Sequence, residues 1–161
     1  MQMPGPYRLT EPLRVTAFDI ASRYIGMAEV AGASRANPSV LAMLKLDNTW
    51  PQDDDVPWCS AFANHVAWLL RLPRSKSLRA RSWLQVGMPI TLAQAQPGFD
   101  VVILKRGGGN QPGPEVIDAP GHVGFYAGRE GDSILVLGGN QSDAVNIGHF
   151  PSSRLLGVRR L

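Results

Sequence analysis

The chain has 161 residues and a formal net charge of +3, and 44% of its residues are hydrophobic. This length fits one domain, and the apolar content excludes an intrinsically disordered chain. The single cysteine, Cys59, excludes intrachain disulfides and the zinc and iron–sulfur sites that need several thiolates.

The positions of charged and apolar residues narrow the possible partners. Consecutive Lys or Arg residues occur only in pairs, at 105–106 and 159–160, and a run of the kind that marks nucleic-acid tails is absent from the sequence, so we expect no nucleic-acid partner. Residues 1–15 contain prolines and a glutamate where a signal peptide needs an unbroken apolar stretch of roughly 7 to 15 residues. We therefore expect an N-terminal extension without a signal peptide. No segment approaches the ~18 apolar residues of a membrane span, and we expect no membrane insertion.

Helical periodicity dominates the first half of the chain. It predicts four helices, over residues 16–31, 37–47, 59–72 and 78–86. Thr16 and Asp19 have the spacing of a capping box for the first helix, and Asn37 before Pro38 is typical of the start of the second. The acidic, proline-containing stretch over 50–57 is predicted to be a loop.

The second half has the pattern of a sheet. Short β-type runs predict strands over 99–105, 123–127, 133–137, 144–147 and 155–159. The Gly/Pro-rich segment 107–120 is predicted to be a long surface loop, and Gly138 with Gly139 indicates a bend. Helices followed by an antiparallel sheet predict an α+β fold, with one catalytic domain over residues 1–161.

Cys59 is the first candidate catalytic residue, because it opens the third predicted helix. The unpaired N–H groups and the dipole at a helix N-terminus stabilise an anion and lower the pKa of a thiol. The same N–H groups can stabilise the oxyanion that forms during acyl transfer. A lone cysteine is also often a small buried hydrophobic residue, and this alternative stays open.

A base is required, and the chain has three histidines, His65, His122 and His149. His65 lies six residues after Cys59 on the same helix, about 240° around its axis, and therefore faces elsewhere. His149 ends a weak strand and is expected to face solvent. His122 begins a strand, as in the papain-type arrangement, and Asn140 follows 18 residues later to orient the imidazole. Alternatively, Asn140 has only a structural role in a turn.

Five segments resemble a known family: DDVPWCSAFANHV, ARSWLQVG, PGFDVVILKRG, GHVGFYAG and VLGGNQSDAV. They resemble the NlpC-like and CHAP-type cysteine peptidoglycan hydrolases, in particular a small single-domain group of phage and prophage endolysins. The resemblance runs from about Ile20 to Arg160. It implies a papain-like NlpC/CHAP fold in which Cys59 attacks an amide or peptide bond, His122 acts as base and Asn140 orients it.

The resemblance also implies partners and a place of action. Peptidoglycan is the expected substrate, with no cofactor, and we expect a monomer made in the bacterial cytoplasm that reaches the periplasmic wall after holin-type or specialised release. The activity is expected to be that of an N-acetylmuramoyl-L-alanine amidase or a D,L-endopeptidase. Four residues near the predicted catalytic positions are candidates for substrate binding: Trp58, Ser60, Arg81 and Trp83. Each Trp is alternatively a core residue.

Other classes remain as alternatives. A contact-dependent antibacterial effector, neutralised by an immunity protein, would use the same chemistry, and a cell-wall-binding module could keep the fold without the reaction. A zinc hydrolase is disfavoured because no HExxH-type pairing occurs. The acidic run over 53–55 lacks the alternating ligands of a calcium loop and is interpreted as a solvated loop rim that also caps the Cys59 helix. No metal site is therefore predicted.

Overall fold

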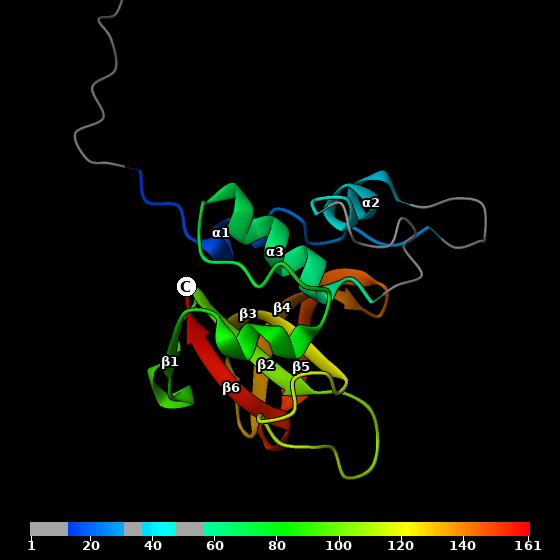
Figure 1. Ribbon diagram of the computed structural model, residues 1–161. Helices are drawn as coiled ribbons and strands as arrows, with labels where there is room; N and C mark the ends of the chain where they lie inside the picture. Colours follow the sequence, from blue (N-terminus) through cyan, green and yellow to red (C-terminus); the bar gives the residue numbers. More distant parts are fainter. Residues whose placement is uncertain (1–12, 31–36, 48–56) are drawn as a thin grey trace, which may run out of the picture.

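The computed structural model describes residues 13–30, 37–47 and 57–161. Within these ranges, three short α-helices lie on one side of a sheet (Figure 1): α1 (Ala17–Ser22), α2 (Pro38–Leu44) and α3 (Cys59–Leu69). Three 3-10 helices accompany them: η1 (Ala80–Gln85), η2 (Leu92–Gln94) and η3 (Ser152–Arg154). None of the described helices has the length and apolar content needed to cross a membrane.

The sheet has six strands, and every neighbouring pair is antiparallel. Their order across the sheet is β1 (Met88–Ile90), β6 (Leu155–Arg160), β2 (Asp100–Lys105), β3 (Gly121–Glu130), β4 (Ser133–Gln141) and β5 (Ala144–Pro151). The predicted α+β fold, with N-terminal helices packed on a C-terminal antiparallel sheet, is confirmed.

The helices are shorter than their apolar periodicity predicts. The capping box at Thr16 is present, but α1 ends at Ser22 and is followed by four turn residues, the last of which is Gly26 with a φ of +95°. Asn37 caps α2 as expected, and α3 ends before Arg71, whose φ is +55°. The predicted fourth helix is the 3-10 helix η1. The left-handed backbone at these positions is incompatible with continued α-helix.

All five predicted strands are present, and β3, β4 and β5 are longer than expected. The structure adds β1 at the edge of the sheet, which the sequence analysis missed. Its central residue is Pro89, which cannot donate a ladder hydrogen bond and is tolerated on an edge strand. The predicted N-terminal extension up to residue 12 and the loop over 50–56, with its acidic run, lie outside the described residues.

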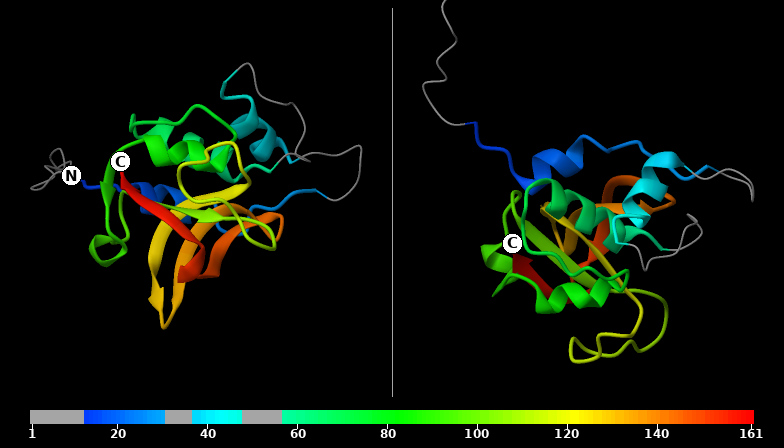
Figure 2. Two further views of the ribbon diagram at one scale, coloured as in Figure 1. Left: turned by 60° about the horizontal axis from the view of Figure 1, so that its bottom comes forward. Right: turned by 45° about the horizontal axis from the view of Figure 1, so that its top comes forward.

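The sheet is curved, as the ribbon in Figure 2 shows. Apolar side chains cover both of its faces. On the helical face, α3 packs against β3 and β4, and the Phe62 ring meets Phe125 edge-on with ring centroids 6.3 Å apart. The opposite face has its own cluster of buried residues: Val102, Leu104, Tyr126, Ile134, Val136 and Val158. Because both faces of β2 are covered, its residues from Asp100 to Leu104 are all buried. This packing fixes where α3 begins relative to the sheet.

A buried polar network holds the first turns of α3 against the segment that follows it. Ser60 Oγ donates to the carbonyl of Ser77 (2.6 Å) and accepts from Trp83 Nε1 (2.9 Å). One turn later, Asn64 Oδ1 accepts from the Lys76 N–H (2.9 Å). Ser60, Asn64 and Trp83 are fully buried, so each of these polar atoms depends on its protein partner.

We expect Ser60→Ala to lower the free energy of unfolding by about 1–3 kcal/mol, because it leaves the buried Trp83 N–H without its acceptor. Urea denaturation of the variant and of Ser153→Ala, an exposed serine, measures this. Equal unfolding midpoints for the two variants would contradict a stabilising role for the network.

Candidate active site

Cys59 is the first residue of α3. The first intrahelical hydrogen bond runs from the Phe62 N–H to the Trp58 carbonyl (2.9 Å), so the N–H groups of residues 59–61 precede the helical ladder. These groups and the helix dipole place positive potential at the thiol. The side chain is 2% exposed, and it is the one cysteine of the chain.

His122 meets Cys59 because α3 packs on β3, where His122 is the second residue. The His122 side chain and the Val123 N–H both interact with the Cys59 thiol and lower its pKa, and the thiol in turn raises the pKa of His122. His122 is 5% exposed, and its ring stacks on Phe150 with centroids 5.1 Å apart and an interplanar angle of 22°. The imidazole is therefore held between the thiol and an aromatic wall.

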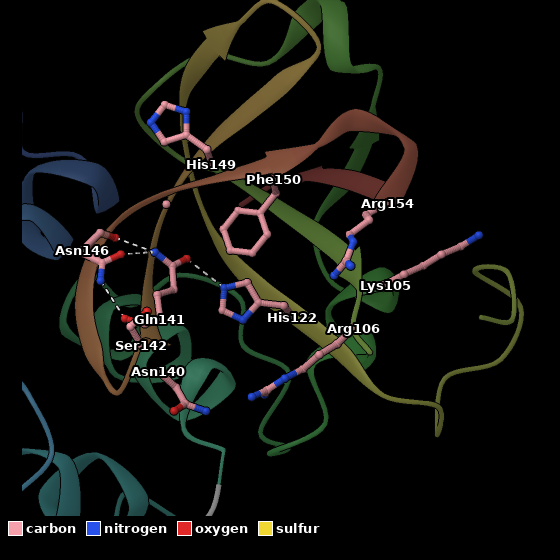
Figure 3. A pocket seen from close by; sticks show the side chains of 11 residues that line it. Lys105, Arg106, His122, Asn140, Gln141, Ser142, Asn146, His149, Phe150 and Arg154 are labelled. Atoms are coloured by element: carbon pink, nitrogen blue, oxygen red, sulfur yellow. Dashed lines mark hydrogen bonds between the residues drawn. The ribbon is translucent and has the colours of Figure 1, made fainter. Parts of the chain in front are cut away.

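Gln141, at the end of β4, holds the other side of the imidazole (Figure 3). Its Nε2 donates to the Val136 carbonyl (3.1 Å) and to the carbonyl and side-chain oxygens of Asn146 (both 2.8 Å). The amide orientation is thereby fixed, with Oε1 directed at His122 Nε2 at 2.9 Å. Since Oε1 can only accept, His122 Nε2 carries a proton and Nδ1 is left for Cys59.

The prediction that Asn140 orients the imidazole is corrected to Gln141. In a regular strand, residues 138 and 140 share a face, and a Cβ on Gly138 would lie 3.3 Å from His122 Nε2. The register shifts between Gly138 and Gln141, and Asn140 is left-handed with φ +54°. This bulge moves the alternation by one residue, so Gln141 faces His122 and Asn140 points away (Figure 3).

Gly138 leaves room for this hydrogen bond. A Cβ at this position would come within 2.6 Å of Gln141 Oε1, which would displace the carboxamide. Two consecutive turn residues, Ser142 and Asp143, have φ of +52° and +58°, the conformation of the tight turns that favour hairpins. The hairpin between β4 and β5 thus returns Asn146 to the Gln141 side chain.

The electrostatics favour a thiolate–imidazolium pair. Burial raises the pKa of the Cys59 thiol, but the hydrogen bond and charge of His122, the Val123 N–H and the nearby Arg106 together hold this pKa below its ordinary value. Burial lowers the pKa of His122, whereas the hydrogen bond and charge of Cys59 and the hydrogen bond to Gln141 raise it above its ordinary value. Each group therefore stabilises the charged form of the other.

Two clefts flank the Cys59–His122 pair. The histidine cleft, about 430 Å³, is the space lined by Lys105, Arg106, His122, Asn140, Gln141, Ser142, Asn146, Gly148, His149, Phe150 and Arg154. The cysteine cleft, about 320 Å³, is lined by Pro57, Cys59, Leu78, Arg79, Ala80, Arg106, Asp118, Ala119, Pro120 and Gly121. Both volumes lie within the range of about 300–1,000 Å³ typical of ligand pockets. Arg106 borders both clefts.

The four predicted substrate-binding residues do not line either cleft, because Trp58, Ser60, Arg81 and Trp83 are all fully buried. Ser60 and Trp83 bond to each other within the core. Trp58 Nε1 donates to the Glu29 carboxylate, and its ring packs against Gly139, where a Cβ would lie 2.6 Å away. The predicted role in substrate contact is therefore wrong for these side chains.

Arg81 has a different part in the site, because it holds the loop over 107–120. Its Nε donates to the Pro120 carbonyl (2.9 Å), and its guanidinium also donates to three further loop carbonyls, those of Pro112, Gly113 and Val116, at 2.7 to 3.1 Å. The loop in turn contributes residues 118–120 to the wall of the cysteine cleft. Arg81 thus shapes the cleft from beneath without facing it.

The other two histidines have partners other than Cys59 and His122, although His149 also lines the histidine cleft. His65 shares a 2.8 Å hydrogen bond with the Tyr24 hydroxyl, and burial lowers its pKa. His149 is exposed and lies 3.4 Å from the Glu130 carboxylate. Within the part of the chain that the structure describes, no three His, Cys, Asp or Glu side chains gather as a metal-ligand set.

The fold is similar to that of a solved structure, NlpC1 from Trichomonas vaginalis. The TM-score is 0.52 and the sequence identity 14%, with 96% of this chain and 47% of that chain covered. The chain thus spans about half the length of the NlpC1 chain. No family model and no curated protein matches the sequence. The similarity establishes an NlpC-like fold, as the sequence motifs predicted.

We expect Gln141→Ala to lower kcat/KM on a cleavable substrate roughly 10- to 100-fold, the loss of one hydrogen bond to a charged imidazole. Asn140→Gly keeps the left-handed backbone and should retain full activity, whereas Asn140→Ala should lower the melting temperature at unchanged specific activity. Steady-state rates and thermal melts of the three variants measure this. If Asn140→Gly were inactive and Gln141→Ala remained active, the residue that orients His122 would be Asn140 and not Gln141.

The pH dependence of Cys59 alkylation tests the ion pair. Because the thiol pKa is lowered, the alkylation rate with iodoacetamide should rise at a pH below that for a free thiol. In His122→Ala the burial of Cys59 remains but its partner is lost, so the inflection should move to higher pH. His65→Ala is the matched control and should leave the profile unchanged. An unshifted profile in His122→Ala would exclude the pair.

Proposed function

We propose that this protein is a cysteine hydrolase that cleaves an amide or peptide bond of bacterial peptidoglycan, with Cys59 as nucleophile, His122 as base and Gln141 as the orienting residue. The observation that carries the proposal is the connected arrangement of helix-initial thiol, imidazole and fixed carboxamide. The NlpC-like fold and the five motifs that resemble peptidoglycan hydrolases favour this substrate class.

The reaction begins with attack of the Cys59 thiolate on the substrate carbonyl carbon. The tetrahedral oxyanion forms at the N-terminus of α3, where the backbone N–H groups of residues 59–61 are available as donors. The imidazolium then gives its Nδ1 proton to the leaving amine, and the C–N bond breaks. A thioester between Cys59 and the acyl group remains.

The same residues hydrolyse the thioester, but His122 now acts as a base and no longer as an acid. His122 Nδ1, now neutral, takes a proton from a water molecule, whose oxygen attacks the thioester carbonyl. Collapse of the second oxyanion breaks the C–S bond and releases a carboxylic acid. The Gln141 carboxamide keeps the Nε2 proton in place through both steps, so Nδ1 alone exchanges protons.

Peptidoglycan as the substrate also determines where the protein acts. We propose that it works on the wall in the periplasm after release from the cytoplasm, and that it does so as a monomer. The net charge of +3 favours binding to an anionic wall. A second possibility is that the protein is delivered to competing bacteria as an effector, with the same reaction. An immunity protein would then neutralise it in the cell that makes it.

Digestion of purified peptidoglycan, followed by mass spectrometry of the soluble muropeptides, tests the proposal. A new N-terminus on L-alanine would identify an amidase, and one on diaminopimelate an endopeptidase. We expect Cys59→Ala and His122→Ala each to lower the rate roughly 1,000-fold or more, because members of a catalytic triad act as a unit. His65→Ala, the matched control, should retain activity.

Circular dichroism establishes that each variant is folded. Hydrolysis by folded Cys59→Ala would overturn the cysteine mechanism, and the absence of any muropeptide release by the wild-type protein would overturn peptidoglycan as the substrate.

A further inference from the structure

Three cations line the histidine cleft: Lys105, Arg106 and Arg154. None of the residues that line this cleft is acidic. Lys105 and Arg106 are half-buried and Arg154 is exposed. In Figure 3 the Arg106 side chain extends past His122, Arg154 lies near Phe150, and Lys105 points outward along the rim.

The sheet register brings these cations to His122. Leu104 in β2 pairs with His122 on one side and with Leu155 in β6 on the other. Lys105 and Arg106 directly follow Leu104, and Arg154 directly precedes Leu155. The three positive side chains therefore emerge where β2 ends and β6 begins, next to the strand that carries the base.

The charge of these residues is not neutralised by the rest of the described chain. Arg160 bonds to the Asp100 carboxylate at 2.7 and 2.8 Å, and Arg74 lies 3.3 Å from Asp47. Within residues 13–30, 37–47 and 57–161, the side chains of Lys105, Arg106 and Arg154 form no ion pair and no hydrogen bond with a carboxylate. Unpaired cations around a cleft attract an anionic ligand.

We propose that Lys105, Arg106 and Arg154 form a carboxylate-binding subsite, so that the enzyme cleaves peptides that carry a free carboxylate beside the scissile bond in preference to their neutral amides. This inference rests on the proposed function and adds the charge of the substrate to it. Arg106 borders both clefts, and its charge acts on both Cys59 and His122. A carboxylate held there lies next to the reacting carbonyl.

The composition of the cleft favours a carboxylate over a neutral group. A guanidinium offers paired donors that match the two oxygens of a carboxylate. Asp118 lies on the cysteine side and not among the residues that line the histidine cleft. The cysteine cleft has two arginines, Arg79 and Arg106, beside this carboxylate, whereas the histidine cleft has three cations and no carboxylate, so a bound anion is attracted more strongly to the histidine side.

The first test compares two synthetic stem peptides, one with free carboxylates and the other with the same groups converted to carboxamides. The ratio of their kcat/KM values is measured for each variant, because any change in the reactivity of Cys59 cancels in this ratio. We expect the wild-type ratio to favour the acid, and Arg106→Gln to lower it about tenfold, as for one charge-assisted hydrogen bond. Arg154→Gln should lower it in the same direction.

Arg106→Lys keeps the positive charge and should restore most of the preference. Arg129→Gln removes the same charge from an exposed position of β3 that does not line the cleft, and should leave the ratio unchanged. An equal loss in Arg129→Gln would mean that net charge, and not the subsite, sets the preference.

The second test requires no peptidoglycan. Cys59 is the single thiol, so its alkylation by anionic iodoacetate and by neutral iodoacetamide can be compared directly. We expect Arg106→Gln to lower the iodoacetate-to-iodoacetamide rate ratio about threefold, the effect of one screened unit charge at close range. Arg106→Lys should restore it, since lysine keeps the positive charge that acts on both Cys59 and His122.

The outcomes separate the two proposals. If the wild-type protein cleaves neither peptide, the proposed function fails and the alkylation ratio alone decides on the subsite. If both peptides are cleaved equally well and the ratios are the same in wild type, Arg106→Gln and Arg154→Gln, the subsite is overturned while the hydrolase stands.

Discussion

The hydrogen bond between His122 Nε2 and Gln141 Oε1 is the interaction on which the arrangement of the site depends. It fixes the tautomer of the imidazole and so determines which nitrogen faces the thiol. The Gln141 carboxamide is in turn held in this orientation, because its amide group donates to the Val136 carbonyl and to Asn146. A local feature of one hairpin, the bulge at Asn140, thus sets the protonation chemistry at Cys59 on a distant helix.

The core supports this interaction from the helical side. Phe62 and its aromatic neighbours seat α3 on β3 and β4, and the Ser60–Trp83 hydrogen bond holds its first turn. Glycines at the points of closest approach, Gly138 and Gly139, allow the carboxamide and the Trp58 ring to lie where a side chain would exclude them. The burial that raises the free-energy cost of a charged thiol also strengthens its interaction with the imidazolium.

The sequence predicted the fold class, the order of the main elements and the Cys59–His122 pair because each has a strong local signal. Periodicity, caps and the position of a residue at an element's end depend on few neighbours. Gln141 was missed because its role depends on a register shift of one residue, and left-handed Asn140 gives no signal beyond that of an ordinary turn. Arg81 and Trp83 were misassigned because residue type does not reveal burial: a fully buried arginine finds its partners in loop carbonyls distant in sequence.

The contacts between Arg81 and the loop over 107–120 do not depend on the side chains of the loop. Every acceptor it uses in the loop is a main-chain oxygen, and the side chains at Glu115 and Asp118 take no part in these bonds. Loop residues can therefore be exchanged without loss of the contacts that set the path of the backbone. The scaffold separates the placement of this wall from its chemistry, so libraries of loop variants would change the side chains that line the cysteine cleft while the path of the backbone stays the same.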